Sequence, residues 1–542
     1  MNDKTSDKMA DSNSLIDQLA VPQKIQPIVW KNDDEKTEIQ KNLDDLELGV
    51  GPSINGSALR QVLASFVAQL GTINTGMAFG FSAIALPQLE SLNSTITISK
   101  VQSSWVASMS SIGTPIGCVL TGYMMDSLGR KKSLIITEIP ALIGWILISF
   151  ATNVEMLYIG RFLVGLGSGM VGAPARVYTS EVTQPHLRGM LTALSSVGVS
   201  TGVLLEYILG SIATWNIVAA LSSIIPFAAL FLMFIYPESP SYLISRSRPD
   251  DAKKALKQFR SSNYNLDKEM NGLIKFSQKN NIKHLSGPRE IIKAILQPNA
   301  LKPFCVLFFY FLIYQWSGTN ALTFYAVQIF NKSGVTINSY LITVVLGVVR
   351  LLSTIMACVL CRKCGRRPLT MISSIGCGIS MIGFSGYLWY YQYWKLNNIE
   401  PSFTWMPVLF IFSYTIACTI GFLVIPWVMI GEVYPVQVRG IMGGLTTFSA
   451  HSFVFSVVKS FPFLIDTITM HGTFLMFGCI SLFGTIYFYT FLPETKNKTL
   501  QEIEDYFSGR NSSLKTGSLK FRKTIIHDDD DKQNQEEEIT KT

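Results

Sequence analysis

The sequence predicts an all-α membrane protein, with twelve transmembrane helices arranged as two six-helix bundles. The first observation is composition: 48% of the 542 residues are hydrophobic and 15% are charged, whereas soluble domains carry about 25% charged residues. The second is a series of apolar windows, each close to the ~20 residues that cross a bilayer core as a helix. The third is an internal repeat, in which charged phrases of the first half return in the same order in the second half.

The apolar windows form two sets of six on either side of a polar, lysine-rich stretch. In chain order they cover residues 59–80, 102–124, 133–151, 156–178, 189–209, 216–236, 304–327, 339–360, 369–391, 406–430, 441–464 and 471–491. We expect five segments in total, since polar sequence also flanks both sets. They are a largely disordered cytosolic tail (1–57), a first bundle (58–236), a cytosolic linker with short helices (237–302), a second bundle (303–492) and a second cytosolic tail (493–542).

Three charged phrases show that the second bundle repeats the first. The phrase EVTQPHLRG at 181–189 returns as EVYPVQVRG at 432–440. GYMMDSLGRKK at 122–132 corresponds to CRKCGRRP at 361–368, and PESP at 237–240 corresponds to PETK at 493–496. Each phrase follows the equivalent window of its half. The chain is therefore a duplicated six-helix unit, which is how one large class of transporters is built.

The charged side chains of these phrases are candidate gate residues. We expect them to pair across the two halves when the cytosolic side is closed, and to separate when the halves rock apart. Each solvated pair then contributes on the order of 1 kcal/mol or less. The alternative is that these charges only set the topology. The candidates are Asp126, Arg130, Glu181, Arg188, Arg366, Arg367, Glu432 and Arg439.

Basic residues in the short loops predict the orientation. They cluster in the loops at Arg130–Lys132, Arg188, Arg362–Arg367 and Arg439, whereas the opposite loops hold Lys100, Lys332 and Lys395. Positive loops stay cytosolic, so both termini and the linker are expected in the cytosol. Asn93, in the sequence NST, then lies outside and is a candidate N-glycosylation site. We identify no phosphate loop, catalytic triad or metal site, and expect neither an enzyme nor a cofactor nor nucleic-acid binding.

Several longer motifs resemble one transporter family over about residues 62–504. They are GRFLVGLGSG (160–169), YTSEVTQPHLRG (178–189), QWSGTNALTFYA (315–326), IPWVMIGEVYPVQVRG (425–440) and PETKNKTLQEIE (493–504). Together with PESP and CGRRP they resemble the sugar porter branch of the major facilitator superfamily, and within it the insect trehalose transporter group. The resemblance implies a monomer in the plasma membrane, in contact with lipid, that binds a sugar midway between two rocking bundles.

A sugar site needs neutral amides, hydroxyls and an aromatic face, because sugar hydroxyls both donate and accept hydrogen bonds. Gln315 and Asn320 lie in an otherwise apolar span, and Ser317-Gly318 between them is expected to break the helix so that both face inward. The alternative is that these amides bond neighbouring helices. Trp427 and Tyr325 are the candidate aromatic contacts, although aromatic residues near helix ends also serve as interface anchors.

The sequence departs from the family pattern at other expected sugar contacts. Where sugar porters usually offer a glutamine in the fifth span, this chain has Ser196. The eighth span carries Arg350, a charge that is costly near the bilayer centre unless it faces a cavity or a partner. We expect Arg350 to line the central cavity, where it either binds the substrate or pairs with Glu206 in one state. The alternative is a structural ion pair buried between helices.

Passive uniport of trehalose or a hexose is the transport mode that the sequence favours. Proton-driven sugar porters need a carboxylate in the first span, and the stretch from Val50 to Leu89 contains neither Asp nor Glu. The alternatives are proton-coupled symport, transport of an anionic solute that Arg350 would attract, and a sugar sensor that does not transport.

Overall fold

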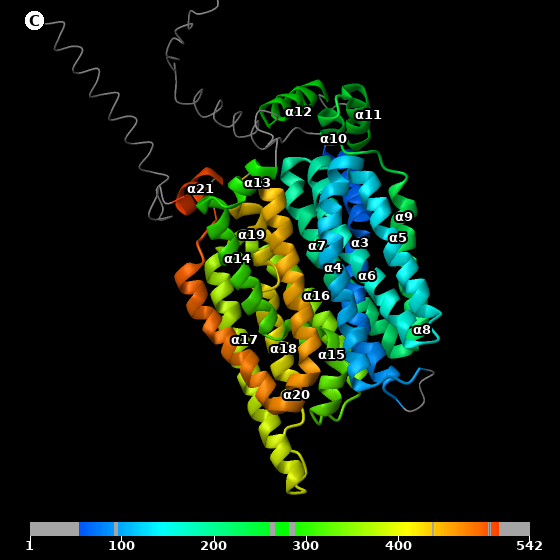
Figure 1. Cartoon of the computed structure of the whole chain (residues 1–542), viewed down its shortest axis with the longest axis vertical. Coiled ribbons are helices and arrows are strands. Elements are labelled where there is room, and N and C mark those ends of the chain that lie inside the picture. Colours follow the sequence, from blue (N-terminus) through cyan, green and yellow to red (C-terminus); the bar gives the residue numbers. More distant parts are fainter. Residues whose placement is uncertain are drawn as a thin grey trace, which may run out of the picture. The chain divides into compact units, whose positions relative to one another are not determined.

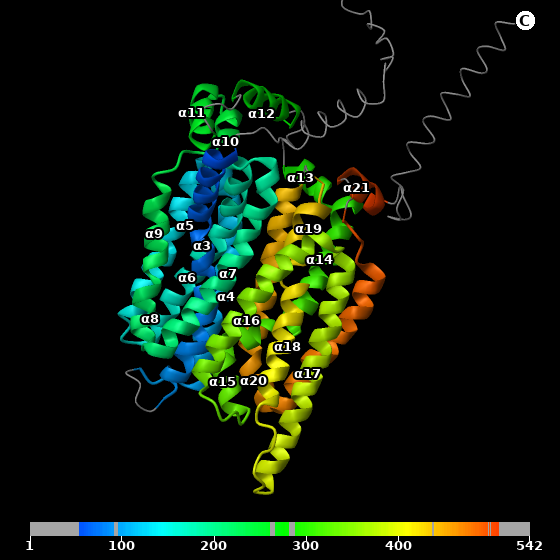
Figure 2. The same cartoon turned by 180° about the vertical axis from the view of Figure 1, so that it is seen from behind.

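The computed structural model describes residues 54–91, 96–260, 266–280, 288–435, 438–496, 498 and 500–508. Within these ranges all regular secondary structure is helical. The glycosylation candidate Asn93, the tail before residue 54 and the chain after residue 508 lie outside the described residues. Figures 1 and 2 show the helices from two opposite sides.

The first half consists of long helices followed by a broken one. These are α3 (Ile54–Leu89), α4 (Lys100–Leu128), α5 (Arg130–Ser149), α6 (Val154–Val182), α7 (Pro185–Ile212), α8 (Trp215–Ser222) and α9 (Ile224–Met233). Pro226 explains the break between α8 and α9. It has no N–H to donate, and its ring crowds the carbonyl four residues earlier, at Ser222.

Short helices connect the halves and lie at one end of the bundle, which we call the linker end (Figure 1). They are α10 (Pro240–Ser245), α11 (Pro249–Phe259), α12 (Leu266–Asn280) and α13 (Pro288–Ile295). Arg260 joins this segment to the first half, because it pairs with Glu269 at 2.7 Å and donates to the carbonyl of Val182 at 2.9 Å. Asp251 stabilises the start of α11, and its pKa is lowered by the hydrogen bond and charge of Arg248.

The second half repeats the pattern with two further broken spans. Its helices are α14 (Pro298–Trp316), α15 (Thr319–Lys332), α16 (Ser339–Lys363), α17 (Arg366–Leu396), α18 (Met406–Ile420), α19 (Ile425–Val433), α20 (Arg439–Phe491) and α21 (Leu500–Ser508). Gly421 separates α18 from α19, where Pro426 again removes a backbone donor. α20 covers the eleventh and twelfth predicted windows, which turn back on each other at Thr469, a residue with φ of 65°.

Each of the twelve predicted windows lies largely within helix. By length and apolar composition, however, the described residues contain 10 helical segments that count as membrane spans, two fewer than predicted. Part of the difference is α20, which contains two windows. The rest is α4, which is absent from that set. Its buried face consists largely of serine, glycine and threonine, so its composition is less apolar although it is 29 residues long.

Glycine brings α4 and α6 into close backbone contact. A Cβ on Gly165 would lie 2.0 Å from the carbonyl oxygen of Ser110, and one on Gly113 would lie 2.4 Å from that of Phe162. Helices in a membrane gain little from hydrophobic association and depend on such close packing of small residues. The small residues of α4 therefore serve packing within the first half.

The two halves meet along α3 with α15, α4 with α20, and α7 with α16. At the end opposite the linker, which we call the far end, Lys100 of α4 forms an ion pair with Asp466 of α20. Lys459 donates to Ser104 at 2.8 Å, and its ammonium lies 3.8 Å from the ring centroid of Trp105. These contacts hold the far ends of the halves together in this conformation.

Candidate functional site

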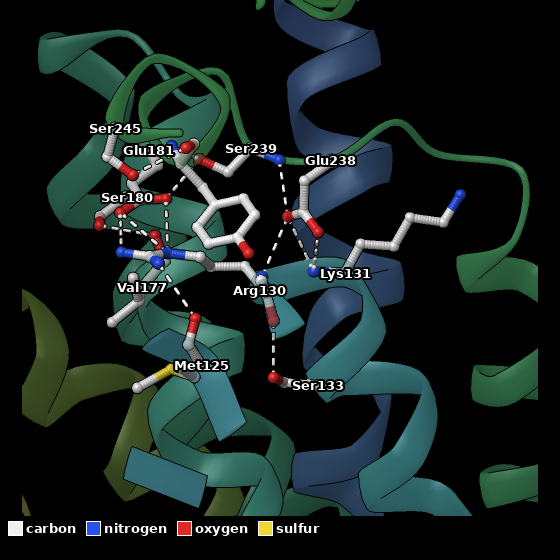
Figure 3. A network of polar contacts seen from close by, with 12 residues as sticks. Met125, Arg130, Lys131, Ser133, Val177, Ser180, Glu181, Glu238, Ser239 and Ser245 are labelled. Carbon is white, nitrogen blue, oxygen red and sulfur yellow. Dashed lines mark hydrogen bonds and ion pairs between the residues drawn. The ribbon is translucent and has the colours of Figure 1, made fainter. Parts of the chain in front are cut away.

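The first copy of the repeated charges forms one network at the linker end (Figure 3). Arg130 begins α5, and its Nε donates to Glu181 of α6 at 3.2 Å. Glu238 of the PESP phrase accepts from the backbone N–H groups of Arg130 and Lys131, at 3.0 and 2.9 Å. A carboxylate at this position satisfies donors that a helix start leaves free and opposes the positive end of the helix dipole. Ser239 donates to the same carboxylate, at Oε2 of Glu181.

The second copy repeats this network residue for residue. Arg366 begins α17 and donates to Glu432 of α19 at 2.6 Å. Glu494 of the PETK phrase accepts from the backbone N–H groups of Arg366 and Arg367, at 3.0 and 3.1 Å. Thr495 takes the role of Ser239 and donates to Glu432 at 2.6 Å. The sequence repeat is therefore also a repeat of side-chain contacts.

The expectation that the gate charges pair across the halves is not met in this conformation. Arg130 and Glu181 both belong to the first half, and Arg366 and Glu432 both belong to the second. The physical reason is packing within each half: α5 lies against α6, and α17 lies against α18, so the start of one helix lies beside the end of the next span of the same half. The remaining candidates make other contacts, or none within the described residues. Arg439 donates to the carbonyl of Tyr434, the guanidinium of Arg367 lies over the ring of Tyr489, the backbone carbonyl of Asp126 accepts from Arg246, and Arg188 is exposed.

Because the two networks are separate, Glu181→Ala and Glu432→Ala are expected to destabilise the protein additively. Each change removes the acceptor of a partly buried arginine, and hydrogen bonds to charged groups contribute about 1.5–3 kcal/mol. Unfolding free energies in detergent would be measured for both single variants and for the double variant. A coupling energy within about 0.5 kcal/mol of zero is expected. A larger coupling would show that the copies act as one cross-half gate, and Arg188→Ala is the control.

The seventh span is broken where its sequence predicts a break. α14 ends at Trp316 and α15 begins at Thr319, and Gly318 between them adopts a left-handed conformation with φ of 97°. The break brings the two candidate amides together: Asn320 Nδ2 donates to Gln315 Oε1. The Gln315 and Asn320 side chains are buried, and the donor and acceptor groups that they present are those that a sugar hydroxyl needs.

The two aromatic candidates contact or belong to the same broken span as the amide pair. Trp427 contacts α14, before the break, and Tyr325 belongs to α15, after it. Trp427, on α19, packs against Phe311 at a centroid distance of 5.0 Å, and the guanidinium of Arg176 lies 5.9 Å from its ring. Tyr325 lies at a kink in α15, where its hydroxyl donates to the carbonyl of Val458 at 3.0 Å. Ser196 is half-buried on α7. Trp427 and Tyr325 therefore each contact a residue of another helix.

Arg350 faces a small cavity that is lined by residues of α7, α15, α16 and α18. Its Nη1 donates to Thr323 at 2.7 Å, and its Nε is buried without a partner. Glu206 is fully buried elsewhere, where it accepts from Ser222 at 3.0 Å. Among the described residues no ion pair joins Arg350 to Glu206 or to another carboxylate, so the pairing is absent from this conformation.

Two charged residues that are buried inside the predicted windows, Arg161 and Glu138, were not selected from the sequence. Arg161 is fully buried and donates to acceptors on both α3 and α4, including the carbonyl of Ala78 at 2.9 Å and Ser82 at 2.7 Å. Glu138, on α5, is 3% exposed and packs against Gly71. The available signal was a charge inside an apolar window, the same signal that identified Arg350 and Glu206.

A larger cavity of ≈ 330 Å³ lies at the far end, lined by residues of both halves. Glu90, at the end of α3, accepts there from Gln328 of α15 at 2.9 Å and from Ser103 of α4 at 2.5 Å. Tyr325 and Phe461 are among its lining residues, so the residue that donates to the carbonyl of Val458 also borders this far-end cavity.

Comparison with known proteins gives consistent results. The profile of the sugar (and other) transporter family matches residues 56–507. The facilitated trehalose transporter Tret1 of Bombyx mori is 34% identical over 448 residues, covering 82% of this chain and 86% of the relative. The protein of the same name from Culex quinquefasciatus is 34% identical over 452 residues, covering 83% and 86%.

Solved structures share the fold at low sequence identity. The proton:xylose symporter XylE bound to 6-bromo-6-deoxy-D-glucose has a TM-score of 0.67 and 21% identity, covering 83% of this chain and 100% of that one. The inward open conformation of the xylose transporter XylE from E. coli has a TM-score of 0.66 and 20% identity, covering 81% and 98%. With the duplicated bundles and the family profile, these matches establish that the chain belongs to the sugar transporter family of the major facilitator superfamily.

Proposed function

We propose that this protein carries a sugar across the plasma membrane by uniport, with trehalose as the first candidate substrate and a hexose as the second. The names of its insect relatives support the choice of trehalose. In this proposal the linker end and both termini face the cytosol, as the basic loops predict. The two halves rock about a central site, which opens alternately to the two sides.

The observation that carries the proposal is the amide pair at the break between α14 and α15. Gln315 and Asn320 are 2% and 5% exposed, and one hydrogen bond joins them, from Asn320 Nδ2 to Gln315 Oε1. A sugar hydroxyl accepts from one amide and donates to the other, so it replaces this hydrogen bond without leaving a buried group unpaired. Trp427 would cover a face of the sugar ring, and Ser196 would contribute a further polar contact. Arg350 would contact the sugar only in a conformation in which the cavity beside it is larger than the present ≈ 30 Å³.

Release toward the linker end is consistent with the contacts between the halves. At the far end, Lys100 pairs with Asp466, and Gln328 donates to Glu90. These groups separate the amide pair from the outer solution and must part before sugar enters from that side. Tyr325 would close over the site when the far end closes, since its hydroxyl reaches the carbonyl of Val458 on α20 in this conformation.

Proton-coupled symport is the second candidate, because the first half buries two carboxylates. Neither Glu138 nor Glu206 forms an ion pair within the described residues, and α3 itself carries no Asp or Glu. A buried carboxylate without a cation is a candidate proton carrier. Uniport is preferred because, among the described residues, no hydrogen bond joins either carboxylate to Gln315 or Asn320.

Uptake of labelled trehalose and glucose tests the proposal. Cells that express the protein would be compared at acidic and neutral pH, with and without an uncoupler. Saturable trehalose uptake that is indifferent to pH and to the uncoupler supports uniport, whereas uptake that the uncoupler abolishes supports symport. If neither sugar moves although the protein reaches the surface, the sugar assignment fails and an anionic solute or a sensor role takes its place.

Replacing Gln315 by alanine is expected to lower kcat/KM for the transported sugar by roughly 10- to 100-fold. The change removes a buried hydrogen bond to the substrate and leaves Asn320 unpaired, at a cost of about 1–3 kcal/mol, and 1.4 kcal/mol corresponds to about tenfold. Initial uptake rates would be normalised to surface protein. Asn397→Ala is the matched control, since that exposed amide caps the end of α17. Unchanged kinetics for Gln315→Ala would remove this residue from the site.

A further inference from the structure

Arg350 is a buried cation whose charge no described carboxylate balances. It is 7% exposed, and among the described residues its guanidinium makes one hydrogen bond, to the neutral hydroxyl of Thr323. Within the same part of the chain its Nε is buried and has no hydrogen-bond partner. A lone charge within a membrane span costs several kcal/mol unless an opposite charge or a solvated cavity stabilises it. The charge of this guanidinium would therefore be compensated by a ligand or by solvent in the adjoining cavity.

Glu206 is poorly placed to act as that counter-charge. Its neighbour Tyr207 faces α16, because a Cβ on Gly347 would lie 3.1 Å from the Tyr207 ring. Glu206 points to the other side of α7, where its Cβ would lie 2.9 Å from a Cβ on Gly80 of α3. Consecutive residues are separated by about 100° around a helix. α7 would have to rotate about its axis before Glu206 could reach Arg350.

The cavity beside Arg350 offers donors to an anion and has little space for anything larger. Its volume is ≈ 30 Å³, whereas one water molecule needs about 10–15 Å³. Two neighbouring hydroxyls already donate to backbone carbonyls and so are not available to an anion. Tyr207 donates to the carbonyl of Thr323, and Thr323 donates to the carbonyl of Thr319. The donors that remain belong mainly to the guanidinium, so the site favours a small acceptor with negative charge.

We propose that Arg350 and this cavity bind a small inorganic anion, of which chloride is the abundant example, in the conformation whose far end is closed. The anion sits among α7, α15, α16 and α18, and so it links the first half to the second. Its binding stabilises this conformation over those in which α7 and α16 separate. The inference does not depend on which sugar the protein carries.

Thermal unfolding of the purified full-length protein tests this directly. The unfolding midpoint would be measured as potassium chloride replaces potassium gluconate at constant ionic strength. Because a ligand that binds only the folded state raises the midpoint with concentration, we expect a rise for the wild type with chloride and with bromide. Equal midpoints in chloride and gluconate would overturn the proposal.

Substitutions test whether Arg350 is the group that binds the chloride. Arg350→Gln is expected to abolish the rise of the unfolding midpoint with chloride. If that variant does not fold, Thr323→Val keeps the charge but removes the hydroxyl that positions it, and is expected to raise the half-saturating chloride concentration at least about threefold. Lys459→Gln is the matched control, since it removes another cation of a membrane span, and it should retain the full response. A chloride response that survives Arg350→Gln, or one that Lys459→Gln abolishes, would place the anion elsewhere.

Discussion

Replacing Arg161 by leucine is expected to destabilise the protein severely and to reduce the fraction that reaches the membrane. This fully buried side chain donates to the carbonyls of Val106 and Ala78 and to the hydroxyls of Ser82 and Ser110, over distances of 2.7–3.2 Å. Each buried acceptor left unpaired costs about 1–3 kcal/mol, so the total is several kcal/mol. The loss falls on α3, α4 and α6 together, because the arginine on α6 joins the other two helices.

The measurement is the unfolding midpoint in detergent, together with the fraction of protein at the cell surface. Arg188→Leu is the control, because Arg188 is exposed and removing it unpairs no described acceptor. Arg161→Lys should recover part of the loss, since an ammonium group has donors but cannot span the same four acceptors. Wild-type stability of Arg161→Leu would mean that water or a rearranged helix satisfies these groups.

Replacing Gly318 by valine is expected to reduce sugar transport per surface molecule by at least about tenfold. Gly318 adopts a φ of 97°, and a Cβ there would lie 2.7 Å from the ring of Phe477. A left-handed conformation costs other residues about 1–2 kcal/mol, and contact with the ring adds to this. We expect the variant to relieve both the strain and the contact by straightening the break, which separates Gln315 from Asn320.

Initial uptake normalised to surface protein measures this effect. Gly386→Ala is the matched control: that glycine also lies in a membrane helix, but no atom lies within 4 Å of a Cβ built on it. It is expected to transport as the wild type does and to be equally or more stable, because alanine favours a helix interior by up to about 1 kcal/mol. Transport by Gly318→Val at the wild-type rate would show that the break is not needed for substrate binding.

Several features of the site were predictable from short-range sequence. The break in the seventh span follows from Ser317-Gly318 within an apolar run, since glycine readily adopts a left-handed conformation. The repeat predicts only that a contact of the first half has a counterpart in the second, and Glu494 does accept from the N–H of Arg366 as Glu238 does from that of Arg130. The sequence did not predict the contact itself, since its partners lie 108 and 128 residues apart in the two copies.

The partners of the remaining charges were not predictable in this way. The gate residues pair within their own halves, and Glu206 lies on the side of α7 that faces away from Arg350. The sequence shows that Arg161 is a charge within an apolar window, but it does not show that the acceptors of its guanidinium lie on α3 and α4. Such partners are chosen by the rotation of each helix about its axis, which twelve weakly amphipathic windows leave undetermined.

Composition, window length and the repeated phrases were sufficient to identify a duplicated twelve-helix membrane protein, because the bilayer requires long apolar helices and duplication copies their loops. The folded chain added the side-chain contacts, which depend on helix rotation and packing. It placed Asn320 against Gln315, left Arg350 beside a small cavity without a counter-charge, and closed the far end through Lys100 and Asp466. These contacts join residues far apart along the chain or across a break, so no local pattern of the sequence encodes them.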